Sequence, residues 1–243
     1  MRTIIWFINF WISLVALVPS MLRAKRLTAD GKLEACDALV QRKVHGWMSR
    51  VLRLAGVCVT VNGLENIPDT PVIFVSNHQG NFDIPILLCY LDKPHGIVAK
   101  MQLKKLPFIN VWMDYLGCVF IDRDNPRQSV AALNDAAQKV QNGQSIIIFP
   151  EGTRSRSNQI GAFKSGAFRI ASKAKVPIVP IRIDGSYKIM EANHMWIKPA
   201  AVNVQIFPPI ETAALSKDEF RNIEDRVREI IVAGELNEMY KSV

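Results

Sequence analysis

The amino-acid sequence predicts an α/β protein, in which a mixed, largely parallel sheet is flanked by helices and preceded by a pair of membrane-associating helices. Three observations lead to this prediction. Residues 4–22 are almost continuously apolar, residues 32–54 show helical periodicity, and after Gly56 short β-branched runs alternate with helical stretches. Strands that alternate with helices are typical of a sheet covered on both faces. We therefore predict N-terminal membrane-associated helices over residues 1–55 and one main domain over residues 56–243.

The N-terminal apolar segment, Ile4–Leu22, has about the 20 residues that a membrane-spanning helix needs, although Pro19 shortens its uninterrupted part. Trp6 and Trp11 suit the depth of lipid headgroups, and the basic residues that begin at Arg23 would hold the following domain on the cytoplasmic side. A helix lying in the membrane interface is the alternative. A cleaved signal peptide lacks a good cleavage site, and a buried helix would have to hide both tryptophans and the proline. Both favoured interpretations place the protein at a membrane, on its cytoplasmic face.

The elements expected after Gly56 follow in order along the chain. Strands are predicted at Val57–Val61, Val72–Ser76, Gly96–Ala99, Cys118–Ile121, Ser145–Phe149, Ile178–Ile183 and Val202–Phe207. Helices are predicted at Ile84–Leu91, Phe108–Leu116, Gln128–Asn142 and Lys164–Lys175. A last helix begins at the capping-box sequence Ser216-Lys217-Asp218-Glu219 and continues with apolar residues at helical intervals: Phe220, Ile223, Val227, Ile230 and Ile231.

The composition limits the partners of this protein. A net charge of +8 and a pI near 9.4 indicate an anionic partner: a nucleic acid, a phospholipid surface or a phosphorylated substrate. A nucleic acid is disfavoured because the basic residues are dispersed and no binding motif appears. The cysteines form no CxxC pair and have no neighbouring histidine arrangement, so we expect buried free thiols and no metal site.

The segment Asn77–Asp83 carries the first chemically informative pair, His78 and Asp83. Five positions on a regular helix separate two side chains by about 140° around the axis, so the pair can meet only across a turn. The strand expected at Val72–Ser76 and the helix that Pro85 can open predict such a strand-turn-helix corner. A carboxylate bonded to one imidazole nitrogen fixes the tautomer and leaves the other nitrogen to accept a proton. Taken singly, Asp83 is as well explained as a helix N-cap.

The segment Phe149–Ser155 follows another apolar strand, at the strand end where ligands of open α/β sheets bind. Gly152 permits close approach of the backbone, Thr153 offers a hydroxyl, and Arg154 can hold a phosphate with two hydrogen bonds. Glu151 suits a substrate hydroxyl, and the alternative is a local ion pair with a neighbouring arginine.

Three further basic residues, Lys100, Arg123 and Lys164, lie after expected strands or at an expected helix start. They can add positive charge to an anion site, although solvated surface charges explain them equally well. The chain has no GxSxG, Walker A, GxGxxG or HExxH motif. A base without a protein nucleophile predicts that the substrate supplies the nucleophile.

Together these segments resemble the glycerolipid acyltransferase family, and most closely its bacterial 1-acylglycerol-3-phosphate O-acyltransferases. Four blocks occur in the order of that family: Asn77–Asp83 as NHxxxxD, Phe120-Ile121-Asp122-Arg123, Phe149–Ser155, and Val176-Pro177-Ile178-Val179-Pro180. The resemblance covers roughly Val57–Phe207 and implies the fold of that family, with residues 56–243 as an acyltransferase domain.

The resemblance implies transfer of a fatty acyl group from an acyl thioester to the sn-2 hydroxyl of 1-acylglycerol 3-phosphate, forming phosphatidate in phospholipid biosynthesis. The donor would be acyl-CoA or acyl carrier protein, with no cofactor and no acyl-enzyme, because a thioester is reactive enough for direct attack. By analogy, His78 is the general base and Asp83 orients it. The residues implied to bind the glycerol and phosphate are Glu151, Gly152, Thr153, Arg154, Lys100 and Arg123.

Backbone amides near the Gly80 turn are expected to stabilise the tetrahedral oxyanion. Gln102 and Asn110 depart from the family, which often has glutamate and glycine at these positions. These departures concern the identity of the acceptor more than the type of reaction. Two alternatives stay open. One is an enzyme of the same family that uses glycerol 3-phosphate or another lysolipid, and the other is a non-catalytic module that binds anionic lipid through its basic surface.

Overall fold

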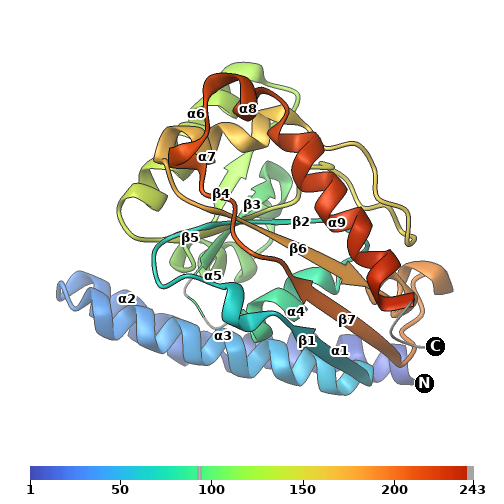
Figure 1. Cartoon of the computed structure of the whole chain (residues 1–243). Coiled ribbons are helices and arrows are strands. Elements are labelled where there is room, and N and C mark those ends of the chain that lie inside the picture. The colour runs from blue at the N-terminus through green and yellow to red at the C-terminus, as the bar shows by residue number, and fades with distance from the viewer. Residues whose placement is uncertain (92, 94, 240–243) are drawn as a thin grey trace.

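The computed structural model describes residues 1–91, 93 and 95–239, and it confirms the predicted α/β architecture. Within these residues one sheet has seven strands in the order β1-β7-β6-β2-β5-β3-β4 (Figure 1). Only the β6–β7 pair is antiparallel, so the sheet is mixed and largely parallel. The strands are β1 (Val57–Asn62), β2 (Ile73–Ser76), β3 (His95–Lys100), β4 (Val119–Ile121), β5 (Ser145–Ile148), β6 (Ile178–Asp184) and β7 (Ala200–Ile206).

Helices cover both faces of this sheet (Figure 1). The α-helices are α1 (Arg2–Ala16), α2 (Val18–Ala29), α3 (Leu33–Ala55), α4 (Asp83–Tyr90), α5 (Ile109–Tyr115), α6 (Pro126–Gln141), α7 (Arg169–Ala174), α8 (Lys217–Arg221) and α9 (Ile223–Met239). Short 3₁₀ segments include η2 (Met101–Lys105), η3 (Ser165–Phe168), η4 (Ser186–Lys188) and η5 (Glu191–Asn193).

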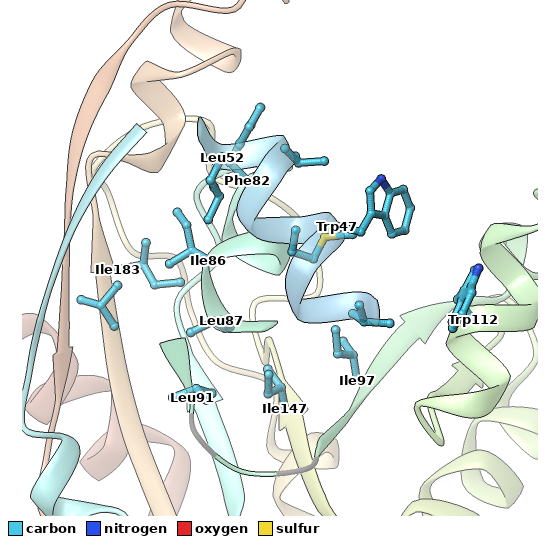
Figure 2. Packing of buried hydrophobic residues seen from close by; sticks show 14 of the residues in the cluster. Trp47, Leu52, Phe82, Ile86, Leu87, Leu91, Ile97, Trp112, Ile147 and Ile183 are labelled. Carbon is cyan, nitrogen blue, oxygen red and sulfur yellow. The ribbon is translucent and has the colours of Figure 1, made fainter. Parts of the chain in front are cut away.

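Two apolar cores lie on opposite faces of the sheet because successive side chains of a strand point to opposite sides. Phe74 of β2 belongs to the core that contains α1, α3, α4 and α5, whereas its neighbours Ile73 and Val75 belong to the core that contains α6, α7 and α9. Figure 2 shows the first core, where Leu52 of α3 lies near Phe82, while the Trp47 ring points to the side on which Trp112 lies. The central strands β2, β5 and β6 are therefore buried on both faces, as their β-branched residues predict, whereas residues of the edge strand β1 are alternately half-buried and exposed.

The N-terminal helices α1 and α2 form one long rod with a single irregularity at Leu17. Pro19 lies in the first turn of α2, where its missing N–H costs little, and the helix is interrupted just before it at Leu17, so its uninterrupted part is shortened as the sequence predicts. Within the described residues, this Arg2–Ala29 rod alone is long and apolar enough to cross a membrane. One face of α1 is exposed and apolar: Ile4, Ile5, Ile8, Trp11, Ile12 and Val15.

The expectation that Trp6 of α1 lies at the depth of lipid headgroups is wrong. Its side chain is buried, its indole N–H donates to the Val51 carbonyl at 3.0 Å, and its ring centroid lies 5.5 Å from that of Phe82. Trp6 is therefore a core residue that fastens α1 to α3 and α4, and only Trp11 remains on the exposed face.

Helix α3 joins the N-terminal helices to the sheet. It packs against α1 and α2 on one side and against α4, α5 and β1 on the other, and it ends at Gly56 in a left-handed conformation with φ +77°. The first core thus continues from α1 to the strands. The division at residues 55 and 56 stays a prediction.

Two predicted helices differ in detail from the structure. The segment Lys164–Lys175 is the 3₁₀ turn η3 followed by the short helix α7, and the last helix is interrupted at Asn222 between α8 and α9. The capping box at Ser216 is confirmed, since Ser216 accepts from the Glu219 amide and the Glu219 carboxylate accepts from the Ser216 amide. Apolar spacing predicted these helices but not their irregularities, which packing decides.

A buried histidine lies far from the chemistry-bearing loops, at the start of β3. The Nδ1 atom of His95 bonds the Lys93 carbonyl, whereas Nε2 has no hydrogen-bond partner among the described residues. Burial lowers the pKa of His95 from 6.5 to about 4. The folded protein therefore holds this imidazole neutral at a pH where the unfolded chain binds a proton.

We expect acid to destabilise the protein through His95. Its contribution to the free energy of unfolding is complete above about pH 6.5 and is lost as the pH falls from 6.5 towards 4, up to about 3 kcal/mol. Urea unfolding at a series of pH values measures it. The variant His95→Gln should lose this part of the pH dependence, and His45→Gln, at an exposed position of α3, should keep it. Identical pH dependence in wild type and His95→Gln would contradict the prediction.

Candidate active site

The predicted site residues gather at one edge of the sheet. The neighbouring strands β2, β5, β3 and β4 run parallel, so their carboxyl ends meet there. His78 follows β2, Gly152 follows β5, Lys100 ends β3 and Arg123 follows β4. A cavity of about 570 Å³ lies at this edge. It is lined by six of the predicted site residues: His78, Lys100, Arg123, Gly152, Thr153 and Arg154. Asp83 and Glu151 lie behind its wall.

The strand-turn-helix corner forms as the sequence predicts. The His78 Nδ1 and Asp83 Oδ2 atoms are 2.6 Å apart, and the Asp83 side chain is fully buried. The same Oδ2 accepts the backbone N–H groups of Gln79 at 2.7 Å and Gly80 at 2.9 Å, while the Ser186 hydroxyl donates to Oδ1. Asp83 is the first residue of α4 and Phe82 is its N-cap, so the carboxylate turns back onto the loop.

The imidazole of His78 is held on two sides. Its ring stacks on Phe149 with 4.2 Å between centroids and an interplanar angle of 24°, and Asp83 fixes Nδ1 as the protonated nitrogen. Nε2 makes no hydrogen bond within the described part of the chain, and the side chain is 18% exposed towards the cavity. This arrangement can accept a proton at Nε2 from a group bound in the cavity.

Glu151 joins the segment Phe149–Ser155 to the segment Asn77–Asp83. Its Oε1 accepts the His78 backbone N–H at 2.7 Å and its Oε2 accepts that of Gly161 at 2.9 Å. The amide of Ser155 also donates to the His78 carbonyl at 2.8 Å. Burial raises the pKa of Glu151, and these backbone hydrogen bonds oppose that shift. Glu151 is buried and absent from the cavity wall, and its two oxygens accept backbone N–H groups, so the geometry shows a structural role, while its binding of a substrate hydroxyl stays a prediction.

Basic side chains converge on Gly152. This residue has φ +74°, and a methyl group on it would lie 3.2 Å from both the Arg123 Nη1 and the Lys164 Nζ atoms. Glycine therefore supplies a left-handed turn and room for two cationic groups. Arg154, on the same loop, donates to the Asn81 side chain and lies 3.6 Å from Glu191. Arg123, Arg154 and Lys100 line the cavity, and Lys164 lies beside Gly152, so positive charge is concentrated at this end of the cavity and can attract an anion.

The rest of the cavity is apolar. Helices α1, α3, α4 and α5 and strand β3 contribute to its wall. The apolar lining residues include Trp6, Phe7, Phe10, Trp47, Met48, Val51, Leu88, Ile97, Ala99, Trp112 and Met113. A cavity with cations and an imidazole at one end and hydrocarbon side chains elsewhere suits an anionic amphiphile.

Comparison with known proteins agrees with this geometry. The family model described as Acyltransferase matches residues 58–184, more than half of the chain. The chain belongs to the acyltransferase family. The matched region contains the corner at His78 and the loops after β4 and β5.

Relatives of this acyltransferase-family chain carry consistent names. It is 41% identical over 156 residues to a probable 1-acyl-sn-glycerol-3-phosphate acyltransferase of Mycoplasma pneumoniae, covering 63% of this chain and 59% of that protein. It is 32% identical to the 1-acyl-sn-glycerol-3-phosphate acyltransferase of Saccharomyces cerevisiae, covering 84% and 68%. The chain spans between 49% and 59% of the length of the first three curated relatives that it matches.

A solved structure resembles the whole acyltransferase-family fold described above. The crystal structure of the 1-acyl-sn-glycerophosphate (LPA) acyltransferase PlsC from Thermotoga maritima superposes with a TM-score of 0.79 at 29% identity. The superposition covers 98% of each chain, so it includes the N-terminal helices as well as the sheet.

The amides of the Gly80 turn do not have the role predicted for them. In this acyltransferase-family site, Gln79 and Gly80 donate their N–H groups to Asp83, and Asn81 donates its own to Glu191 at 2.7 Å. These donors hold buried carboxylates and are not free for an oxyanion. A turn rich in N–H groups predicts an anion partner, but here the chain supplies that partner itself.

Sequence reasoning missed three contributors to the acyltransferase-family site. Ser186 and Glu191 follow β6, which neighbours β2 and ends at the same edge of the sheet. Asn77 uses its side-chain amide to bridge β6, donating to the Ile183 carbonyl at 2.9 Å and accepting the Ile183 N–H at 2.8 Å. The polar residues after the predicted strand Ile178–Ile183 were the available signal, because strand ends of one sheet share an edge.

Proposed function

We propose that this protein transfers a fatty acyl group from an acyl thioester, acyl-CoA or acyl carrier protein, to the sn-2 hydroxyl of 1-acylglycerol 3-phosphate, forming phosphatidate in phospholipid biosynthesis. The observation that carries the proposal is the Asp83-bound His78, which lines a cavity with cations at one end and apolar walls elsewhere and whose Nε2 makes no hydrogen bond to any described residue. The names of the relatives support the same reaction.

The geometry of His78 supports the following reaction. An alcohol becomes a strong nucleophile only as its proton leaves, and Nε2 accepts that proton while the oxygen attacks the thioester carbonyl. The tetrahedral intermediate then expels the thiolate, the C–S bond breaks, and the imidazolium returns the proton to sulfur. Asp83 stabilises the imidazolium between these steps. Direct attack leaves the enzyme unmodified and needs no cofactor.

The cationic cluster would bind the phosphate of the acceptor. Arg123 and Lys164 converge on Gly152, and Arg154 lies on the same loop, so a phosphate there would receive charge-assisted hydrogen bonds from several directions. Thr153 and Lys100 line the same cavity. The apolar walls then receive hydrocarbon chains of the two lipid substrates.

The exposed apolar face of α1 would hold the protein in the interface of a membrane, on its cytoplasmic face. One side of α1 packs on α3 through Trp6 and Leu14, which leaves the opposite side for lipid. The same helix contributes Trp6, Phe7 and Phe10 to the cavity wall, so lipid and site adjoin. Co-sedimentation with vesicles tests this attachment, and protein that stays in solution would contradict it.

An acceptor panel tests the function. Purified protein with an acyl thioester should acylate 1-acylglycerol 3-phosphate at least about tenfold faster than monoacylglycerol, because only the first carries the phosphate. Arg123→Ala should remove most of that preference by raising KM for the phosphorylated acceptor, and Arg127→Ala, at an exposed position of α6, should keep it. Preference for glycerol 3-phosphate or another lysolipid would replace the acceptor proposed here. Lipid binding without product would indicate a non-catalytic module.

A further inference from the structure

Glu191 is a buried carboxylate beside the site that the reaction described above does not use. It belongs to η5, on the connection between β6 and β7, and its side chain is 1% exposed. Its Oε1 accepts the Asn81 backbone N–H at 2.7 Å and lies 3.6 Å from the Arg154 Nη1 atom. Glu191 thus contacts both the turn that carries His78 and the loop that carries Arg154.

The second oxygen of Glu191 has no hydrogen-bond partner among the described residues although it is buried. It lies over Gly80, where a methyl group would come within 2.4 Å of it. A buried oxygen without a partner destabilises a protein, so a carboxylate here is a poor choice for packing alone. Burial raises the pKa of Glu191, while the Asn81 amide and the Arg154 charge favour its ionised form.

The Arg154 guanidinium is oriented by two groups of this cluster. One of its nitrogens donates to the Asn81 side chain and faces Glu191, and the Asn81 backbone is itself held by Glu191. Asn81 stands only three positions after His78. Backbone hydrogen bonds from Ser155 and Arg156 already join the two segments. Glu191 adds the charged contact that sets the direction of the Arg154 guanidinium relative to the His78 turn.

We propose that Glu191 is a positioning residue, which aligns Arg154 with the His78 turn so that an acceptor bound through its phosphate presents its hydroxyl to Nε2. This inference rests on the proposed function, because it needs a phosphorylated acceptor. Misplacement of reacting groups by about 1 Å is enough to reduce a rate strongly. The loss of Glu191 therefore acts on the acceptor side of the reaction through Arg154.

A double-mutant cycle tests the proposal. Glu191→Gln keeps an oxygen for the Asn81 amide but removes the charge that faces Arg154, and it should lower kcat/KM for 1-acylglycerol 3-phosphate about tenfold, with KM for the thioester unchanged. In the Arg154→Ala background, whose His78 and Asp83 are intact, the same substitution should have less than about a twofold effect. Asn193→Ala is the matched control in η5, since its side chain donates to the Lys188 carbonyl and, among the described residues, to no group of the site, and it should keep wild-type kinetics.

The outcomes separate the two proposals. Equal effects of Glu191→Gln with and without Arg154 would overturn the positioning role, as would a parallel fall in kcat/KM for both substrates that tracks a fall in Tm. Full activity of Glu191→Gln would also overturn it. A wild-type protein that transfers no acyl group to any phosphorylated acceptor would instead overturn the proposed function.

Discussion

Replacing His78 with alanine is expected to reduce acyl transfer by about 10²- to 10⁴-fold while the fold stays intact. The substitution removes the nitrogen that would accept the hydroxyl proton. The buried Asp83 carboxylate keeps its hydrogen bonds from the Gln79 and Gly80 amides and from Ser186, so no unpaired charge is left in the core. Initial rates with 1-acylglycerol 3-phosphate and an acyl thioester measure the effect.

The control for His78→Ala is His45→Ala, which removes an exposed histidine from α3. It should retain wild-type activity, and both variants should unfold at the wild-type Tm within a few degrees. If His78→Ala keeps its activity, His78 is not the general base. If both the Tm and the activity of His78→Ala fall strongly, the histidine is needed for folding.

Replacing Asp83 with asparagine is expected to lower kcat by about 10²- to 10⁴-fold. An amide of the same shape can keep an oxygen towards the Gln79 and Gly80 amides and turn its nitrogen to Ser186, so the loop stays closed. What disappears is the negative charge 2.6 Å from Nδ1, which would stabilise the imidazolium formed when His78 takes the proton. Steady-state kinetics of the purified variant report the loss in kcat.

Asp135→Asn is the matched control for Asp83→Asn, because Asp135 lies on the exposed surface of α6, where it pairs with Lys139. Its kinetics should equal those of the wild type. Unchanged kcat in Asp83→Asn would remove the orienting and stabilising role of the carboxylate. A variant of both His78 and Asp83 should lose little more than His78→Ala alone, since the two residues act as one unit.

Local patterns were enough for the sheet and for the catalytic corner. Alternating apolar strands and helices predicted a sheet covered on both faces, and the turn residues Gly80 and Asn81 between a strand and Pro85 predicted that His78 and Asp83 meet. The place of Lys100, Arg123 and Gly152 around one cavity followed from the rule that parallel strands end at one edge. The roles of these residues in catalysis and binding remain proposals.

Other assignments depended on partners distant in the sequence. Trp6 has the amphipathic character of a headgroup residue, yet its ring is buried against Phe82 because α1 packs across α3 and α4. The structural role of Glu151 could not be predicted either, because its oxygens accept hydrogen bonds from the backbone N–H groups of Gly161 and of His78, which is distant in the sequence. Glu191 had no motif of its own.

The sequence by itself determined the fold class, the family and the pairing of His78 with Asp83, because strand periodicity, turn chemistry and short motifs are properties of neighbouring residues. Only the tertiary structure decided which backbone N–H groups donate hydrogen bonds to the carboxylates of Asp83, Glu151 and Glu191. The physical reason is that a buried carboxylate must find N–H donors, and the donors near it depend on how distant loops pack together.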